Sequence, residues 1–465
     1  MSEKNEDYRD KLSTIADDGK RIWVYPKKPK GAFFNKRKLL SYFFLIVLFG
    51  VPHLKINGLP VLLLNIVERK FIIFGKIFWP QDFFIFAIAM MTGIVFISLF
   101  TIIYGRLFCG WICPQTIFME MVFRRVEYLI EGDYKQQQWL NKQEWNAKKL
   151  FKKTLKHGIF FGISFLVANT FLAYIIGPEA LWEIQMVAPS EHLQGLISIT
   201  IFSFVFYGVF AFMREQICTT ICPYGRLQGV LLDSKSIIVA YDYLRGEGRA
   251  KYKKNEVRKD VGKGDCIDCN QCVDVCPTGI DIRNGTQLEC VNCTACIDAC
   301  DFMMESVNLP KGLIRLDSED GIKNGEAFKW TKRIKVYSGV LILLLVFLTY
   351  IIVSRKDFDT TITRANGTIQ KSVGNNQMSN IFDVTLINKT TNNYVITLKL
   401  LEEKGKIDLV RNKIILKEQS EVKGKFVITM DKKDIKHGKN KITIGIYGDG
   451  ELIEKKTTVF MGPLL

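Results

Sequence analysis

The chain has 465 residues, of which 48% are hydrophobic, and it carries a formal net charge of +17. This length allows several domains. The lysines and arginines flank long apolar runs, so we expect no nucleic-acid partner and predict a membrane protein. The charged residues 1–38 precede the first apolar run without a small-residue cleavage site, so this run should remain as an anchor.

Apolar stretches of about twenty residues predict about five membrane-spanning helices. They are Leu39–Ile56, Phe83–Tyr104, Gly158–Ile176, Leu193–Met213 and Ile334–Val353. The first span is the least regular, because Pro52 and His53 lie near its end.

The distribution of lysine and arginine among the loops predicts the orientation of the spans. Residues 1–38 and the loop 105–157 are rich in both, whereas the connection Gly177–His192 contains neither. We therefore place residues 1–38, 105–157 and 214–333 in the cytoplasm. With five spans, residues 354–465 lie on the opposite side of the membrane.

Two copies of a CxxxCP motif follow the second and fourth spans at the cytoplasmic membrane boundary. Their cysteines are Cys109, Cys113, Cys218 and Cys222. The prolines after Cys113 and Cys222 suit the first position of a helix, so these cysteines should cap helix N-termini. There the helix dipole favours thiolate, the form of cysteine that binds metal or undergoes redox chemistry.

Packing cysteines are the alternative interpretation, because free cysteine is often buried like a small apolar residue. Two matching pairs at equivalent membrane positions favour a functional role instead. The pattern leaves open a soft metal site, a redox dithiol and a further iron–sulfur cluster. A thiolate site selects Cu(I) over harder ions and would thus favour reduction of captured Cu(II).

Eight further cysteines form two runs with the same CxxCxxCxxxC spacing. The runs are Cys266, Cys269, Cys272 and Cys276, and Cys290, Cys293, Cys296 and Cys300. In bacterial ferredoxins with this spacing, each run gives three thiolates to one [4Fe–4S] cluster and its fourth to the other. Cys300 therefore completes the first cluster, and Cys276 completes the second.

Such clusters transfer single electrons, so the spacing predicts an electron-transfer protein with a ferredoxin-type domain at about residues 258–310. Zinc is the alternative, because CxxC pairs also hold zinc. However, a zinc site needs only four ligands, and this requirement does not explain the third cysteine in each CxxCxxC run. Disulfides are disfavoured, because crowded CxxC spacings in a reducing compartment are typical of metal sites.

The C-terminal residues 354–465 contain no cysteine and show the β-branched enrichment of strands. The strand segments are Tyr394–Leu400, Lys413–Lys417, Lys425–Thr429 and Lys441–Tyr447. A region of this length built from short strands predicts an immunoglobulin-like sandwich. The predicted fold class is a multi-domain membrane protein with an α-helical bundle, a cytoplasmic ferredoxin-like domain and a C-terminal all-β sandwich.

Several segments together resemble the CcoG (FixG/RdxA) family of cytochrome c oxidase accessory proteins over nearly the whole length. They are Arg21–Pro26, Cys109–Gln115, Cys222–Gln228, the two ferredoxin runs and Gly312–Arg315. The resemblance implies a multi-pass protein of the bacterial cytoplasmic membrane, with its C-terminal domain in the periplasm. It also implies a role in assembling cbb3-type oxidase by reducing Cu(II) to Cu(I).

By this resemblance the four CxxxCP cysteines handle copper, and the eight ferredoxin cysteines bind the two clusters. The protein would then be a cupric reductase. Its implied partners are a copper chaperone or copper transporter, oxidase subunits and a cytoplasmic electron donor that the sequence does not identify. The oligomeric state stays open, with a homodimer as one arrangement.

Two other functions remain as alternatives. One is a quinol dehydrogenase-type membrane ferredoxin, similar to the NapH and NosR proteins, that passes electrons to a periplasmic reductase. An outer sandwich without cofactor ligands of its own argues against such onward transfer. The other is a non-catalytic scaffold for oxidase assembly, in which the sandwich docks an oxidase subunit.

Overall fold

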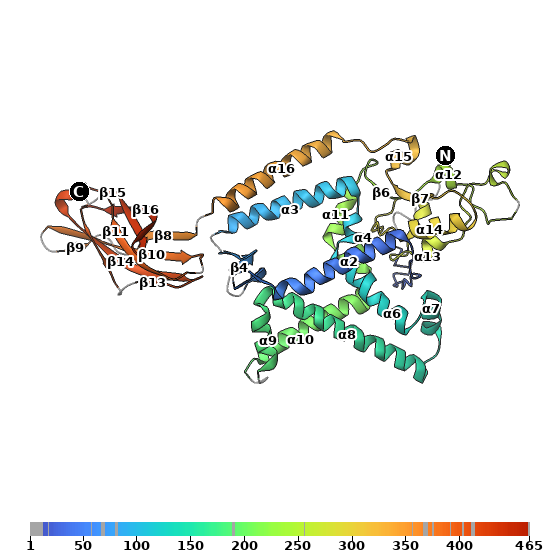
Figure 1. Cartoon of the computed structure of the whole chain (residues 1–465), viewed down its shortest axis with the longest axis horizontal. Helices are drawn as coiled ribbons and strands as arrows, with labels where there is room; N and C mark the ends of the chain where they lie inside the picture. Colours follow the sequence, from blue (N-terminus) through green and yellow to red (C-terminus); the bar gives the residue numbers. More distant parts are fainter. Residues whose placement is uncertain are drawn as a thin grey trace. The chain divides into compact units, whose positions relative to one another are not determined.

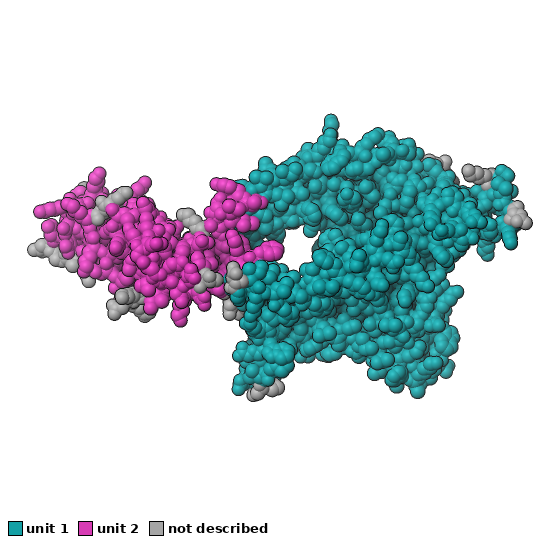
Figure 2. Space-filling view, viewed as in Figure 1, with its two compact units in different colours: residues 1–69, 83–348 teal, residues 70–82, 349–465 magenta. Residues whose placement is uncertain are grey.

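The computed structural model describes residues 13–463 except 17, 57, 67–69, 80–81, 188–190, 255, 356, 366–370, 374–375, 391, 402–403 and 411–413. The chain divides into two compact units, which Figure 2 colours separately. The first comprises residues 1–69 and 83–348, and the second comprises residues 70–82 and 349–465.

Long helices form much of the first unit (Figure 1). They are α2 Ala32–Gly50, α3 Phe83–Tyr104, α8 Ala147–Ile176, α10 Leu193–Gly208 and α16 Lys332–Val353. Among the described residues, four helical stretches are long and apolar enough to cross a membrane: Phe83–Tyr104, Ala147–Ile176, Leu193–Met213 and Lys332–Val353. The most apolar part of α16 contains no buried residue, as expected of a helix surrounded by lipid.

Two predicted spans differ from the observed helices in their bounds, and α2 begins at Ala32 instead of Leu39. The span Leu39–Ile56 is not one helix, because α2 ends at Gly50 and a short 3-10 turn follows around Pro52. Proline has no N–H to continue the helical hydrogen bonds. The third predicted span, Gly158–Ile176, forms the second part of a longer helix. Helix α8 begins at Ala147, because the lysine-rich segment before the apolar run is helical too.

Helix α2 connects the cysteine-rich region with the far end of α8. At its start, the backbone N–H groups of Phe33 and Phe34 donate to the Asp298 carboxylate at 3.1 and 2.7 Å. Near its end, the hydroxyl of Tyr174 in α8 donates to the carbonyl of Leu48 at 2.9 Å. Both ends of α2 are therefore fixed to other parts of the first unit.

Aromatic packing holds the chain after the first CxxxCP motif against the long helices. The Phe123 ring stacks on Phe210 with the centroids 4.5 Å apart and meets Phe160 of α8 edge-on at 4.8 Å. Phe123 ends the π-helix η3 Phe118–Phe123, and Phe210 lies in the π-helix η4 Val209–Met213. These contacts bring the segments beside the two motifs together.

The cysteine-rich region is built on a small antiparallel pair of strands. Strand β6 Ile238–Tyr241 pairs with β7 Ile314–Asp317, and the eight ferredoxin cysteines lie between them in the chain. Helix α13 Gln271–Asp274 carries Cys272 of the first run, and helix α14 Ala295–Ser306 carries Cys296 and Cys300 of the second. Shorter elements of this unit are β1 Lys55–Ile56, β2 Leu59–Pro60, β3 Leu62–Asn65, α6 Arg124–Ile130, α7 Tyr134–Lys142, α9 Pro178–Met186, α12 Tyr243–Gly246, η6 Arg258–Val261, η7 Ile282–Asn284 and α15 Glu319–Asn324.

The second unit is the predicted β-sandwich, together with a hairpin of β4 Lys70–Ile73 and β5 Lys76–Phe78. One sheet has the order β12-β14-β10-β8 with β9 on β10, and the other has the order β13-β11-β15-β16. The strands are β8 Phe358–Arg364, β9 Lys371–Val373, β10 Gln377–Asn388, β11 Tyr394–Leu400, β12 Lys406–Leu409, β13 Ile414–Leu416, β14 Glu421–Asp431, β15 Lys439–Gly448 and β16 Glu451–Met461.

The sandwich core is apolar and aromatic. Phe382, Phe426 and Phe460 are fully buried in it, and the rings of Phe382 and Phe426 stack at 5.4 Å. Strand β11 has the predicted bounds, and the other three predicted segments overlap β13, β14 and β15. The immunoglobulin-like fold expected from the sequence is therefore confirmed.

Candidate metal centres

The two ferredoxin runs follow the same backbone path. In the first, Asp268 and Asn270 have φ angles of 52° and 59°, and in the second the equivalent Asn292 and Thr294 have 50° and 63°. Left-handed residues between cysteines turn successive N–H groups inward, which makes the anion-binding nest common at iron–sulfur sites. Since β-branched Thr294 adopts this conformation only at a cost, its surroundings must impose the turn.

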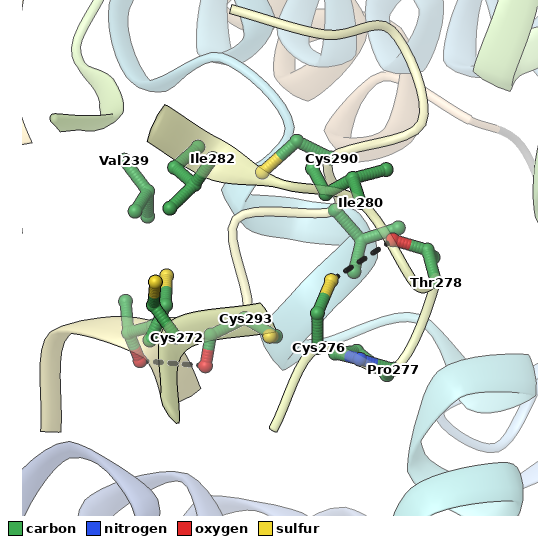
Figure 3. Close-up of a pocket in the computed structure, with 12 residues that line it drawn as sticks. Val239, Cys272, Cys276, Pro277, Thr278, Ile280, Ile282, Cys290 and Cys293 are labelled. Carbon is green, nitrogen blue, oxygen red and sulfur yellow. Dashed lines mark hydrogen bonds between the residues drawn. The ribbon is translucent and has the colours of Figure 1, made fainter. Parts of the chain in front are cut away.

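One group of thiols joins the second run to Cys276 of the first. The pKa of Cys290 is raised to about 12, mainly by burial and in part by the neighbouring thiols of Cys276 and Cys293. Burial also raises the pKa of Cys296 well above its usual range, with the same thiols contributing. In Figure 3 the sulfur atoms of Cys276, Cys290 and Cys293 face one open space.

The other group joins the first run to Cys300 of the second. The pKa of the Cys300 thiol is raised to about 12, mainly by burial and in part by the nearby thiols of Cys269 and Cys266. Burial likewise raises the pKa of Cys272, which is close to Cys300 and Cys269. Thiols of the two runs therefore lie near one another, and Cys272 also lines the space beside Cys276, Cys290, Cys293 and Cys296.

The donors in both groups are cysteine thiols, the ligands that iron–sulfur clusters take. Across the described part of the chain, no three His, Cys, Asp or Glu side chains lie close enough to hold a single metal ion. Zinc draws four ligands to about 2.3 Å from one point. A four-iron cluster holds its thiolates around a wider core, and the apolar Val239, Ile280 and Ile282 line the space beside Cys276. These residues fit a [4Fe–4S] cluster.

The prolines of both CxxxCP motifs begin helices, as predicted. Cys113 is the N-cap of α5 Pro114–Ile117, and Cys222 is the N-cap of α11 Pro223–Leu231. The first cysteine of each pair lies in a short helix, Cys109 in α4 Leu107–Trp111 and Cys218 in the π-helix η5 Ile217–Ile221. The side-chain nitrogen of Gln228 in α11 lies 3.5 Å from the Cys109 sulfur, so the two motifs lie together.

At Cys113 the helix N-terminus, expected to favour thiolate, is outweighed by burial. Burial raises the pKa of Cys113, and this effect exceeds the opposite effect of the Thr116 and Gln115 backbone amides. Burial also raises the pKa of Cys109, and that of Cys218 to about 12. A metal that binds these sulfurs must therefore displace protons.

The first CxxxCP motif packs directly on the second ferredoxin run. Cys109 belongs to the same buried apolar cluster as Val291 and Cys293, with Cys296 against it. A Cβ at Gly110 would stand 3.0 Å from the backbone nitrogen of Cys293 and closer still to the Val291 carbonyl oxygen. Only glycine allows this approach, which places a CxxxCP thiol beside a proposed cluster ligand.

A network of buried charges surrounds this junction, and sequence reasoning missed it. Arg124 pairs with Glu120 and, at 3.4 Å, with Glu215, while Arg214 donates to both carboxylate oxygens of Glu127 at 3.1 and 2.9 Å. The one available signal was the i,i+4 spacing of Glu120 and Arg124 within an amphipathic stretch. The partners of the longer-range pairs are far apart in the chain.

Comparison with protein-family models identifies three regions of the chain. Residues 84–134, with the first CxxxCP motif, match a "4Fe-4S binding domain". Residues 213–319, with the second motif and both ferredoxin runs, match a "4Fe-4S dicluster domain". Residues 348–463 match an "IG-like fold at C-terminal of FixG".

Curated relatives support the same assignment. Protein RdxA of Cereibacter sphaeroides is 36% identical over 63% of this chain and 62% of its own length. Nitrogen fixation protein FixG of Rhizobium meliloti is 35% identical over 63% of this chain and 57% of its own length. The chain thus spans about three fifths of these two proteins.

A third relative matches over a longer region. Protein RdxB of Cereibacter sphaeroides is 32% identical over 388 residues, which are 80% of this chain and 80% of that protein. Together with the match to the C-terminal domain of FixG, this similarity covers the helices, the cysteine-rich region and the sandwich. The chain belongs to the FixG/RdxA family and contains the 4Fe-4S domains described above.

Proposed function

We propose that this protein is a membrane-bound cupric reductase, which converts Cu(II) to Cu(I) at its CxxxCP cysteines for the assembly of cbb3-type oxidase. The observation that carries the proposal is the packing of Cys109 against Val291 and Cys293. It places a thiol suited to copper beside the residues proposed to hold an electron carrier.

The eight ferredoxin cysteines are the proposed ligands of two [4Fe–4S] clusters. Cys266, Cys269, Cys272 and Cys300 would hold one cluster, and Cys276, Cys290, Cys293 and Cys296 the other. When bound, such clusters supply single electrons at potentials set by burial and by hydrogen bonds to sulfur. This chain contributes Thr278, whose hydroxyl lies 3.4 Å from the Cys276 sulfur.

The CxxxCP cysteines bind the metal substrate in this proposal. Thiolate ligands favour Cu(I) over Cu(II), so their capture of copper makes its reduction by one electron more favourable. Each thiol that binds copper releases its proton to water. Burial raises the pKa of Cys109, and two neighbours partly oppose this effect: Arg106, and the Gln228 side chain, whose amide nitrogen lies 3.5 Å from the Cys109 sulfur.

The proposed topology places the cysteines in the cytoplasm and residues 354–465 in the periplasm of a bacterial inner membrane. It requires α2 to cross as a fifth helix. The hydrogen bond from Tyr174 to Leu48 supports this crossing, because it shows that α2 reaches the depth of the last turns of α8. Copper would come from a chaperone or transporter and pass to oxidase subunits, as the family resemblance implies.

Cys109→Ser and Cys218→Ser test the proposal. The purified protein is reduced anaerobically with dithionite, excess reductant is removed, and Cu(II) is added with a chelator that reports Cu(I). Each variant should reduce copper at least about tenfold more slowly while keeping its iron–sulfur absorbance, because a soft ligand is lost but no cluster ligand. Copper reduction at the wild-type rate in both variants would show that the CxxxCP cysteines take no part in the reaction.

A further inference from the structure

A basic loop, residues 248–264, leads into the first ferredoxin run. It contains seven lysines and arginines and only two acidic residues. The loop is closed by a hydrogen bond of 3.2 Å from the Gly264 N–H to the Gly248 carbonyl, and the Ala250 N–H donates to the Cys266 carbonyl at 3.3 Å. The buried Arg258 side chain also donates to the Cys266 carbonyl, at 2.9 Å. The base of the loop is therefore fixed to a proposed cluster ligand.

The exposed side chains of the basic loop are cationic and apolar. They are Lys251, Tyr252, Lys253, Lys254, Val257 and Val261. Exposed positive charge attracts negatively charged partners over a distance and orients them on contact. Exposed apolar side chains among these charges can exclude water from such a contact.

Strand β6 begins beside α3 and the second ferredoxin run. The N–H of Ile237, just before the strand, donates to the Ile103 carbonyl in the last turn of α3 at 2.9 Å. The N–H of Val239 donates to the side chain of Asn292, in the second run, at 3.2 Å. This end of the strand is therefore close to the membrane boundary and to the run on which Cys109 packs.

The first run and the basic loop begin beyond the other end of β6. The N–H of Asp265, beside Cys266, donates at 2.9 Å to the carbonyl of Arg245, which follows the last strand residue Tyr241 by four positions. On the partner strand, Asp317 pairs with Ile238, and the chain then continues toward α16. Both α3 and α16 thus connect to the end of the strand pair opposite the loop. Polybasic segments that bind lipid lie next to membrane helices, so this arrangement favours a soluble partner.

The N-terminal segment covers the turn that carries Cys276. The Ser13 hydroxyl donates to the Thr278 carbonyl at 2.9 Å, and the Lys27 N–H donates to the Asp274 carbonyl at 2.6 Å. A protein that delivers electrons therefore meets less obstruction at the basic loop than at this turn.

We propose that the exposed residues of the basic loop dock an acidic electron-carrier protein, which gives single electrons to the first ferredoxin run. The inference rests on the proposed function and names the class of its electron donor. Contacts between electron-transfer proteins are small and weak, so a few lysines and apolar side chains suffice. The carrier loses one electron and is oxidised, the site proposed for Cys266 and Cys300 gains that electron, and no bond is formed or broken.

Reversing three lysine charges tests the inference. The full-length protein, purified anaerobically with its iron, carries Lys251→Glu, Lys253→Glu and Lys254→Glu together. Reduced flavodoxin, an acidic carrier of single electrons, is the probe, and stopped-flow absorbance follows reduction of the iron–sulfur centres. At low salt this loop variant should be reduced at least about tenfold more slowly than the wild type. The difference should shrink as salt screens the charges.

Two controls separate docking from other effects. Photoreduced deazariboflavin, a small uncharged reductant, needs no docking and should reduce the loop variant at the wild-type rate. A control variant with Lys135→Glu, Lys142→Glu and Lys148→Glu makes the same charge change at exposed positions of α7 and the start of α8. It should react with flavodoxin at close to the wild-type rate. Equal slowing in the two variants, or wild-type rates in the loop variant, overturns the inference.

A binding measurement independent of electron transfer uses lysine acetylation, read by mass spectrometry, on the wild-type protein in nanodiscs. In neutral lipid, flavodoxin should protect the three loop lysines and leave the three control lysines reactive. Without flavodoxin, a change from neutral lipid to anionic phosphatidylglycerol should leave the loop lysines reactive. Protection by the anionic lipid alone would mean that the loop binds the membrane, and the inference would fail.

These outcomes are separable from those for the proposed function, whose test starts from protein reduced by dithionite. If flavodoxin reduces the loop variant normally while Cys109→Ser no longer reduces copper, the docking assignment fails and the reductase proposal stands. If Cys109→Ser and Cys218→Ser both reduce copper normally, the reductase proposal itself fails, whereas slow reduction of the loop variant by flavodoxin still supports docking.

Discussion

Arg124 donates a 2.9 Å hydrogen bond from its Nη2 to the carbonyl oxygen of Pro277, the residue after Cys276. The arginine is 1% exposed, and its charge is balanced by Glu120 and Glu215. A buried guanidinium therefore holds the turn that carries a proposed cluster ligand. Since charge interacts strongly where water is excluded, this cation should favour the reduced, more negative state of the site.

The first prediction concerns the reduction potential at this turn. Arg124→Gln should lower the potential of the cluster held by Cys276 by about 30–60 mV, where 59 mV corresponds to a tenfold change for one electron. The carboxylates of Glu120 and Glu215, left without their cationic partner, would lower this reduction potential further. The measurement is a potentiometric titration followed by electron paramagnetic resonance.

The neighbouring residue provides the control. Arg125 contacts Tyr42 and Met121 instead of the Pro277 turn, so Arg125→Gln should leave both potentials unchanged. Equal potentials in Arg124→Gln and Arg125→Gln, with both clusters present, would show that Arg124 has only a structural role.

The second prediction concerns the contact between the first CxxxCP motif and the second ferredoxin run. In Gly110→Ala the added Cβ overlaps the Val291 carbonyl and forces the two backbones apart, at a cost of about 1–3 kcal/mol in stability. Copper reduction by the pre-reduced protein should slow, while iron content is retained. Gly93→Ala is the control, because a Cβ there meets no atom within 4 Å. Equal rates in the two variants would mean that electrons do not cross at Gly110.

The third prediction concerns pH. Because burial raises the pKa of Cys218 to about 12, its thiol is protonated near neutral pH and must lose its proton on binding Cu(I). Affinity for Cu(I) should therefore rise as pH increases, by about tenfold per pH unit for each thiol that loses a proton. Chelator competition between about pH 6.5 and pH 8 measures this slope. A slope of zero would show that the sulfurs bind as preformed thiolates.

The sequence predicts local features of this protein better than its long-range contacts. The effect of a proline depends on a few adjacent residues, so the helix starts at Pro114 and Pro223 could be anticipated. The pairing of Arg214 with Glu127, or of Arg124 with Pro277, depends on how distant segments pack. Charge counting assigned Arg124 to membrane topology alone, because a sequence does not show which arginines are buried.

The last prediction concerns the number of membrane crossings. Four helices of the described chain meet the criteria of length and apolarity, and four crossings would leave both termini on one side. Helix α2 has 19 residues and a length of about 28 Å, close to the roughly 30 Å of a bilayer core. Its lysines and arginine lie in its first turns, where they can reach the cytoplasmic interface.

Five crossings should therefore place the termini on opposite sides. Alkaline phosphatase fused after residue 465 should be active, because the enzyme needs the periplasm, and green fluorescent protein fused before residue 1 should fluoresce. A phosphatase fusion after Thr331, before α16, is the control and should be inactive. An inactive C-terminal fusion together with a fluorescent N-terminal one would mean that α2 does not cross, and the sandwich would then face the cytoplasm beside the cysteines.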